Sequence, residues 1–252
     1  MRTIDQFNFK NKKAIIRVDF NVPIDNNKVT DTSRIKAAKQ TIDKVCNDGG
    51  SCVLVSHLGR PKGFQKEFSM TNIINDVENV LERNVILSKD VIGPDAKKKS
   101  LDLKSKQVLL LENVRFHDEE KKGDIDFAKE LSLLADCYIN DAFGTAHRSH
   151  ASTTTISTFF NDKFFGKCLE REVNSIKKVL NSGEKPILAI LGGAKISSKI
   201  PILKNIIKIA DHIIVGGGMS FTFIKAMGGQ IGLSIHEDSM LDTAKEIIEK
   251  AE

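Results

Sequence analysis

Polar and cationic side chains follow four apolar runs in the first 150 residues of this sequence. Behind the runs at 14–18, 52–55, 108–111 and 137–139 come, in order, Asp19, Asn21 and Arg34; His57 and Arg60; Arg115; and Arg148. In an open parallel sheet, ligands bind at the carboxyl ends of the strands. Because those ends share one edge of the sheet, we expect the cations to converge on one crevice. The pattern predicts a pocket for a small, highly charged anion.

The segment 57–61 (HLGRP) combines a turn with two hydrogen-bond donors. Gly59 and Pro61 fix the turn, and Arg60 offers a planar fork that suits phosphate or carboxylate better than a lysine would. The alternative is an ordinary surface loop with a satisfied histidine, since such residues are common in loops. The segment by itself leaves these two interpretations evenly balanced.

Two further polar segments each allow two interpretations. The segment 140–150 (NDAFGTAHRSH) contains hydroxyls, an arginine and two histidines. Its histidines are three apart with no cysteine or third histidine nearby, so a metal site is the weaker interpretation and we assign no metal ligand. Asp19 and Asn21 either stabilise a turn, which is the usual role of such residues, or orient hydroxyl groups of a ligand.

Two glycine-rich turns follow strands in the last third of the sequence. The segment 192–199 (GGAKISSK) predicts a glycine turn that opens a helix, with Lys195 and Lys199 four apart on one face. Backbone N–H groups at a helix start can hold phosphate oxygens, and the glycines at 216–218 repeat the arrangement. Neither a P-loop nor a GxGxxG fingerprint is matched. Close strand–helix packing is the alternative, but two neighbouring glycine turns favour a site for nucleotide phosphates.

Strand and helix signals alternate along the chain, which predicts an α/β fold. Continuous apolar strands indicate a doubly wound parallel sheet in an N-terminal domain, 1–168, with helices on both faces. An amphipathic helix and hinge follow at 169–185, and the segment 186–252 predicts an incomplete second Rossmann-like α/β domain. Two strands cannot make a covered parallel sheet, and the last helix is still running at 247–252. We therefore expect the sequence to stop inside a domain.

The composition is that of a cytoplasmic enzyme. The chain has 252 residues, 40% of them hydrophobic, which is enough for a sizeable core. A net charge of +5 suits an acidic ligand but is too small to indicate nucleic acid, and base-stacking platforms are not expected without Trp and with one Tyr. The four cysteines form no CxxC pair and indicate reduced thiols. No apolar run reaches 18 residues and no signal peptide is present, so no membrane association is expected.

Six motifs, in this order and spacing, together resemble the phosphoglycerate kinase family. They are RVDFNVP (17–23), SHLGRPKG (56–63), LLLENVRF (109–116), NDAFGTAHRSHAS (140–152), LGGAKISSKI (191–200) and VGGGMSFTF (215–223). The resemblance implies a monomeric two-domain hinge enzyme of glycolysis. Such an enzyme transfers a phosphoryl group reversibly from 1,3-bisphosphoglycerate to ADP, giving 3-phosphoglycerate and ATP.

The resemblance also implies a role for individual residues. The substrate-binding set on the N-terminal domain would be Asp19, Asn21, Arg34, His57, Arg60, Arg115 and Arg148. The set that lines the phosphates of Mg-ADP or Mg-ATP would be Gly192, Gly193, Lys195, Lys199 and Gly217. Arg34 and Lys199 would be catalytic, because they would face the phosphoryl group during transfer.

The sequence departs from the family pattern in one respect. The family has a glutamate-bearing loop that holds the nucleotide sugar and a GGGD[ST] turn whose aspartate helps to bind magnesium, and neither is among these 252 residues. We therefore expect a truncated chain without its magnesium ligand and without activity of its own. The alternative function is a catalytically inactive fragment that binds 3-phosphoglycerate. A nucleic-acid binder, suggested by the basic composition alone, is the remote alternative.

Overall fold

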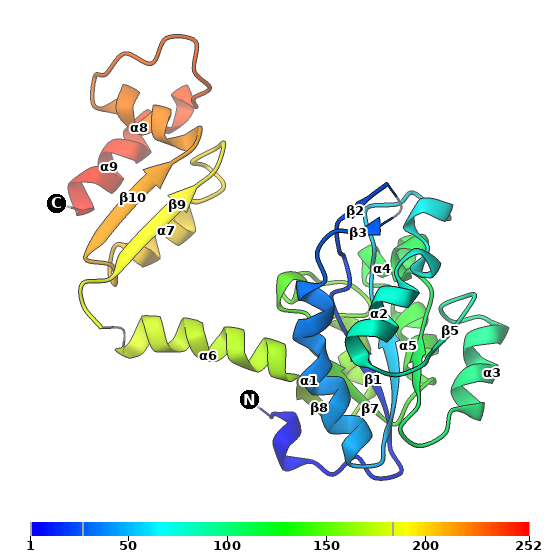
Figure 1. The fold of residues 1–252 in the computed structure, drawn as a ribbon. Coiled ribbons are helices and arrows are strands. Elements are labelled where there is room, and N and C mark those ends of the chain that lie inside the picture. The colour runs from blue at the N-terminus through cyan, green and yellow to red at the C-terminus, as the bar shows by residue number, and fades with distance from the viewer. Residues whose placement is uncertain (1, 27, 183, 252) are drawn as a thin grey trace. The chain divides into compact units, whose positions relative to one another are not determined.

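The chain folds into two compact units, Met1–Val173 and Asn174–Glu252. The computed structural model describes residues 2–26, 28–182 and 184–251. Figure 1 shows the first unit in blue to green and the second in yellow to red. Helix α6 (Lys167–Ser182) contains the boundary between them. Each unit is described by itself below.

A parallel sheet forms the centre of the first unit (Figure 1). Its order is β5 (Val85–Leu87), β6 (Val108–Leu110), β4 (Ser51–Val55), β1 (Lys13–Arg17), β7 (Cys137–Asn140) and β8 (Lys163–Phe165). Every neighbouring pair is parallel, and Ile15 of β1 lies opposite Val53 on one side and Tyr138 on the other. A short antiparallel hairpin, β2 (Ile24–Asp25) with β3 (Lys28–Val29), lies outside this sheet. The predicted parallel α/β sheet is confirmed.

Helices cover both faces of this sheet. Successive side chains of a strand point to opposite faces, so Leu54 belongs to one buried cluster and its neighbour Val53 to the other. The first cluster contains apolar residues of α1 (Ser33–Asn47) and α2 (Ile74–Leu81). The second contains those of α3 (Pro94–Asp102) and α5 (Ile125–Ser132). The sheet is doubly wound, as the continuous apolar strands predicted.

Short helical turns carry the chain between these elements. They are α4 (Asp118–Lys122) and the 3-10 turns η1 (Ile4–Gln6), η2 (Lys66–Phe68), η3 (Met70–Asn72), η4 (Val114–Phe116), η5 (Phe143–Thr145) and η6 (Thr155–Phe159). A further 3-10 turn, η7 (Asp238–Met240), belongs to the second unit. Across the described residues, no helix combines the length and the apolar character that crossing a bilayer requires. The four cysteines are free thiols, and three of them are buried.

The second unit has a smaller sheet and one buried cluster. Strands β9 (Leu188–Gly192) and β10 (His212–Gly216) pair in parallel, with Ile190 opposite Ile214. Helices α7 (Ile200–Ile206), α8 (Met219–Ala226) and α9 (Leu241–Ala251) supply most of the buried cluster. Along β9 the side chains alternate between half-buried and exposed, and Ile190 is 71% exposed. The described part of this sheet is therefore packed on one face.

Candidate functional site

Three of the predicted arginines line one pocket of the first unit. The pocket has a volume of about 380 Å³ and is lined by Arg60, Arg115, Lys121, Arg148 and His150. Arg60 follows β4, Arg115 follows β6 and Arg148 follows β7, so the pocket lies at the carboxyl edge of the sheet. Sequence reasoning did not select Lys121, which is an exposed residue in a run of five charged side chains, 118–122.

Arg115 is held rigidly and still has an unused donor. Its side chain is 4% exposed. The side-chain oxygen of Asn113 accepts a hydrogen bond from its backbone N–H at 3.0 Å, and one terminal guanidinium nitrogen donates to the Gly59 carbonyl at 2.9 Å. Its Nε is buried and has no partner among the described residues. Burial, and then the charges of Arg148 and Arg17, lower the pKa of Arg115 to about 10. An anion bound in the pocket would offset the repulsion from Arg148 and Arg17.

His57 is a neutral donor at the base of this cluster. It is buried, and burial followed by repulsion from Arg17, Arg115, Arg148 and Arg34 lowers its pKa to about 2. Its Nδ1 lies 3.2 Å from a terminal nitrogen of Arg17. A guanidinium can donate but not accept, so Nδ1 is the acceptor and the ring proton sits on Nε2.

Asp19, Asn21 and Arg34 form a connected group beside His57. Asp19 Oδ2 accepts a hydrogen bond from Arg34 at 2.9 Å, and its Oδ1 accepts one from the Asn21 N–H at 3.2 Å. Asn21 Oδ1 accepts from the Gly59 N–H at 2.7 Å. Both residues therefore stabilise turns, which is the ordinary role considered for them. Asp19 Oδ1 also lies 3.9 Å from His57 Nδ1, so the group borders the predicted site.

A buried polar network that sequence reasoning missed lies under these residues. Arg17, 1% exposed, donates from Nε to Ser152 Oγ at 2.9 Å. Ser152 Oγ donates to Glu120 Oε1 at 2.7 Å, and its backbone N–H donates to Glu120 Oε2 at 2.8 Å. One signal was available, because Arg17 is a charged residue inside a continuous apolar strand. Nothing local distinguishes Glu120 from the acidic residues beside it.

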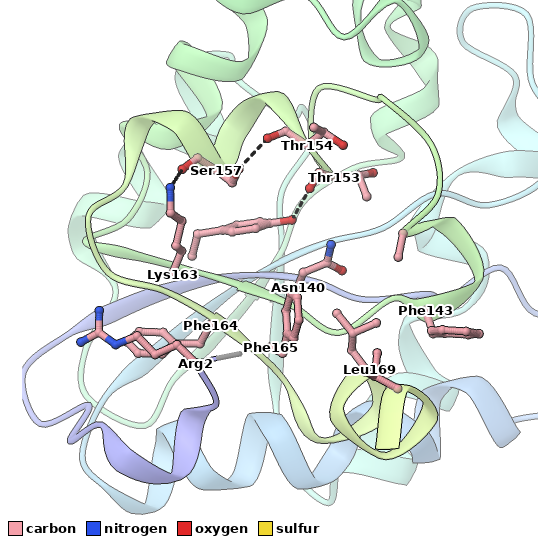
Figure 2. A pocket seen from close by; sticks show the side chains of 13 residues that line it. Arg2, Asn140, Phe143, Thr153, Thr154, Ser157, Lys163, Phe164, Phe165 and Leu169 are labelled. Atoms are coloured by element: carbon pink, nitrogen blue, oxygen red, sulfur yellow. Dashed lines mark hydrogen bonds between the residues drawn. The ribbon is translucent and has the colours of Figure 1, made fainter. Parts of the chain in front are cut away.

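A larger cavity of the first unit is mostly apolar, unlike the pocket lined by arginines. It has a volume of about 530 Å³ and is lined largely by apolar groups, among them Phe143, Phe164, Phe165 and Leu169 (Figure 2). Both of its cations already have partners: Arg2 pairs with Asp162 at 3.1 Å, and Lys163 donates to the carbonyl of Ser157, another lining residue, at 3.0 Å. None of the predicted site residues lines it. The larger cavity is therefore not the anion site.

The two glycine turns of the second unit pack against each other. A side chain at Gly217, where φ is +68°, would place its Cβ 3.0 Å from the Gly193 carbonyl oxygen. The Met219 N–H, at the start of α8, donates to that same carbonyl at 2.8 Å. Close approach of backbone and the positive φ explain the glycine at 217, whereas a Cβ at Gly193 would meet nothing nearer than 3.7 Å. Gly192 is the last residue of β9.

The prediction that a helix opens directly from the first glycine turn is wrong. Helix α7 begins at Ile200, with Pro201 in its first turn, a position that proline favours. Lys195 lies in the connecting segment and Lys199 directly before the helix, so the two lysines do not share a helical face. Ser197 is held by Glu237, with bonds of 3.0 Å from its N–H and 2.7 Å from its hydroxyl. These bonds keep the segment 193–199 as a loop.

Within the part of the chain that the structure describes, no group of three or more His, Cys, Asp or Glu side chains is arranged to hold a metal ion.

Comparisons with known proteins give one consistent result. A family model for phosphoglycerate kinase matches residues 4–252. Phosphoglycerate kinase of Porphyromonas gingivalis is 47% identical over 275 residues, covering 99% of this chain and 66% of the relative. That of Anaeromyxobacter sp. (strain Fw109-5) is 46% identical over 256 residues, covering 100% and 65%.

Solved structures agree with these relatives. The structure of phosphoglycerate kinase from Coxiella burnetii matches with a TM-score of 0.84 and 36% identity, over 99% of this chain and 63% of that one. The enzyme from Pyrococcus horikoshii matches with a TM-score of 0.85 and 28% identity, over 99% and 65%. The chain thus spans 63–66% of the length of these four proteins.

Proposed function

The chain belongs to the phosphoglycerate kinase family, and on that premise we propose that its first unit binds 3-phosphoglycerate or 1,3-bisphosphoglycerate. The complete enzyme would transfer a phosphoryl group reversibly between 1,3-bisphosphoglycerate and ADP. The observation that carries the proposal is the pocket that Arg60, Arg115 and Arg148 line. A phosphate there would receive charge-assisted hydrogen bonds, which are stronger than neutral ones.

The remaining substrate residues fit the other end of a glycerate. Asp19 and Asn21 lie beside His57, and we assign to them the hydroxyl and carboxyl end of the substrate. The Arg34 side chain is half exposed, so it can leave Asp19 for a phosphoryl group without a large desolvation cost. His57 would contribute its Nε2–H as a neutral donor.

The chemistry of transfer requires placement more than covalent help. A carboxylate or an ADP oxygen is already a competent nucleophile, so no general base is needed. The protein has to bring two polyanions together, neutralise charge on the transferring group and exclude water. We assign Arg34 and Lys199 to that charge, as the catalytic pair. Hinge closure between the two substrate-binding parts belongs to the same proposal.

The second unit would bind the nucleotide, which enters as its magnesium complex. Gly192, Gly193, Lys195, Lys199 and Gly217 would line the phosphates of ADP or ATP. The open surroundings of Gly192 and Gly193 support this assignment, because a Cβ at either position would meet nothing nearer than 3.7 Å. We further propose a cytoplasmic monomer that acts on small molecules rather than on nucleic acid or membranes.

Calorimetry with 3-phosphoglycerate tests the substrate assignment on the 252-residue chain. Replacing Arg60 or Arg148 with Ala should weaken binding by on the order of 1.5–3 kcal/mol, or about 10- to 150-fold, the range for hydrogen bonds to charged groups. Arg2→Ala is the matched control, because Arg2 lines the larger cavity and pairs with Asp162. Equal affinities for the wild type and both pocket variants would contradict the proposal.

A further inference from the structure

We propose that Glu120 is a positioning residue for the anion pocket, which it organises through Ser152 and Arg17. The identity of the ligand rests on the proposed function, but the network itself does not. Glu120 would not touch the substrate. It would fix the guanidinium that holds His57, together with the chain segment that carries Arg148 and His150.

Burial sets Glu120 apart from its neighbours. Helix α4 begins with three acidic residues, of which Asp118 and Glu119 are exposed, whereas Glu120 is 0% exposed. A carboxylate is costly to bury unless hydrogen bonds satisfy it. Both of its oxygens are satisfied by Ser152, through the N–H at 2.8 Å and the hydroxyl at 2.7 Å. Such a residue is placed for those bonds rather than for solvation.

These bonds attach α4 to one wall of the pocket. The Glu120 carbonyl also accepts the Ala151 N–H at 2.8 Å, so Ala151 and Ser152 are both held by one residue. His150, immediately before them, has Nδ1 3.7 Å from Glu120 Oε1 and lines the pocket. Arg148 lies two residues earlier. Glu120 thus anchors the segment that presents two pocket residues.

The hydroxyl of Ser152 links Glu120 to Arg17 by hydrogen bonds. A hydroxyl has one proton, and Ser152 gives it to Glu120, so its lone pairs are turned toward Arg17 Nε at 2.9 Å. Arg17 then donates to His57 Nδ1 at 3.2 Å and to the Val18 carbonyl. The chain of hydrogen bonds runs from Glu120 to Ser152, Arg17 and His57, and so links residues that follow β4 and β7 across β1.

The charge of Glu120 also affects anion binding, in the direction opposite to its positioning role. The negative charge of Glu120 counteracts the lowered pKa of Arg115 and of His150. Removing it would make the pocket more positive, which by electrostatics alone would tighten anion binding. Removing the positioning would weaken binding instead. The direction of the change therefore separates a positioning role from a purely electrostatic one.

Two pairs of matched variants make the test. Glu120→Gln removes the charge and one of two acceptor oxygens, and Glu119→Gln makes the same change on an exposed neighbour. Ser152→Ala removes the hydroxyl relay, and Ser157→Ala removes a hydroxyl that donates to the Thr154 carbonyl outside the network. We expect Glu120→Gln and Ser152→Ala to weaken 3-phosphoglycerate binding about tenfold or more. The two controls should stay within about twofold of the wild type.

A second measurement, made without ligand, tests the hydrogen-bond network directly. Nitrogen-15 NMR of the ligand-free chain should show a slowly exchanging Arg17 Nε–H and an unprotonated, hydrogen-bonded His57 Nδ1. Both signals should change in Glu120→Gln and Ser152→Ala and persist in the controls. The urea-unfolding transition, followed by far-ultraviolet circular dichroism, checks that each variant is folded. If Glu120→Gln does not fold, Ser152→Ala decides the question.

The outcomes distinguish the two proposals. If the wild type does not bind 3-phosphoglycerate but the NMR signals still change in the variants, the proposed function is wrong and the hydrogen-bond network is supported. The positioning role is wrong if the wild type binds and the variants bind equally or more tightly. It is also wrong if the Arg17 and His57 signals are unchanged in the variants.

Discussion

The strands of the two units differ in how completely their side chains are covered. Every residue of β4 in the first unit is buried, whereas β9 in the second alternates between exposed and half-buried. The cations differ in the same way: Arg17 and Arg115 are almost fully buried, and Lys195 is exposed. Because helices pack on both faces of the first sheet, its side chains have few alternative conformations. The comparison teaches that a sheet covered on both faces holds its polar side chains in place by burying them, whereas a sheet packed on one face leaves them exposed.

The largest expected effect comes from truncating one aliphatic side chain in each sheet. Leu54→Ala, at a fully buried position of β4, should lower the free energy of unfolding of the first unit by about 3 kcal/mol through lost burial and a cavity. Ile190→Ala, on the exposed face of β9, should change the stability of the second unit by less than about 0.5 kcal/mol.

Each unit has its own probe for that experiment. Fluorescence of Tyr138, the single tyrosine, follows urea unfolding of the first unit. Amide hydrogen exchange in β10 follows the second, and wild-type amides of β6 should exchange far more slowly than those of β9 and β10. Similar protection in both sheets, or a costly Ile190→Ala, would remove the contrast between the units.

The next effect tests whether a buried imidazole limits the first unit in acid. The folded pKa of His57 is about 2, against 6.5 for an unperturbed histidine. Between these values the unfolded state binds one more proton, so stability falls as the pH drops, by about 1.4 kcal/mol per pH unit. Between pH 7 and pH 5 that loss is about 2 kcal/mol, and His57→Asn should lack it.

Urea unfolding at pH 7 and pH 5, followed by Tyr138 fluorescence, measures this difference. His212→Asn is the control, because His212 is an exposed residue of the second unit and should leave the Tyr138 transition unchanged. A His57→Asn variant with the same loss between pH 7 and pH 5 as the wild type would mean that the folded state accepts the proton.

A smaller effect of opposite sign is expected at Asp141. Its Oδ1 accepts the N–H groups of Cys168 and Leu169 at the start of α6, while burial raises its pKa to about 6. Between 3.8, the ordinary pKa of an aspartate, and the raised pKa the folded state binds more protons, so this contribution to stability is lost as the pH rises. Asp141→Asn should therefore gain about 1.4 kcal/mol relative to wild type between pH 5 and pH 7.

The same two-pH titration tests Asp141, with Asp102→Asn as an exposed control in α3. Because His57 and Asp141 act in opposite directions, their effects on stability between pH 5 and pH 7 should partly cancel in the wild type. If Asp141→Asn showed the same change in stability between pH 5 and pH 7 as the wild type, the carboxyl would be ionised in the folded chain throughout this range.

Periodic and continuous apolar patterns account for the parts of the fold that the sequence predicted. The spacing of Ile35, Ala38, Ile42 and Val45 predicted one face of α1, and all four are buried. The run at 52–55 predicted β4, whose residues are buried on both faces. In both cases the signal is local and repeats often enough to outweigh single residues.

Features that depend on tertiary contacts were missed. The three-residue strands β5 and β8 are too short to show a period. The helix expected at Gly193 begins instead at Ile200, because Pro201 and the bonds between Ser197 and Glu237 decide its start. Glu120 differs from its acidic neighbours by a contact with Ser152, 32 residues away. The roles of the site residues stay predictions.

The position of β1 in the sheet has a consequence for how the first unit is made during translation. β1 precedes the other strands of its sheet in the sequence, yet it lies between β4 and β7 in the sheet. Ile15 of β1 therefore lacks its second neighbour, Tyr138, until β7 has been synthesised. Pairings so distant in sequence form slowly, because a long loop has to close first. While the ribosome is still adding residues, β1 presents an apolar edge that another chain could pair with. Synthesis of β7 is therefore the step after which the nascent chain can bury its own centre.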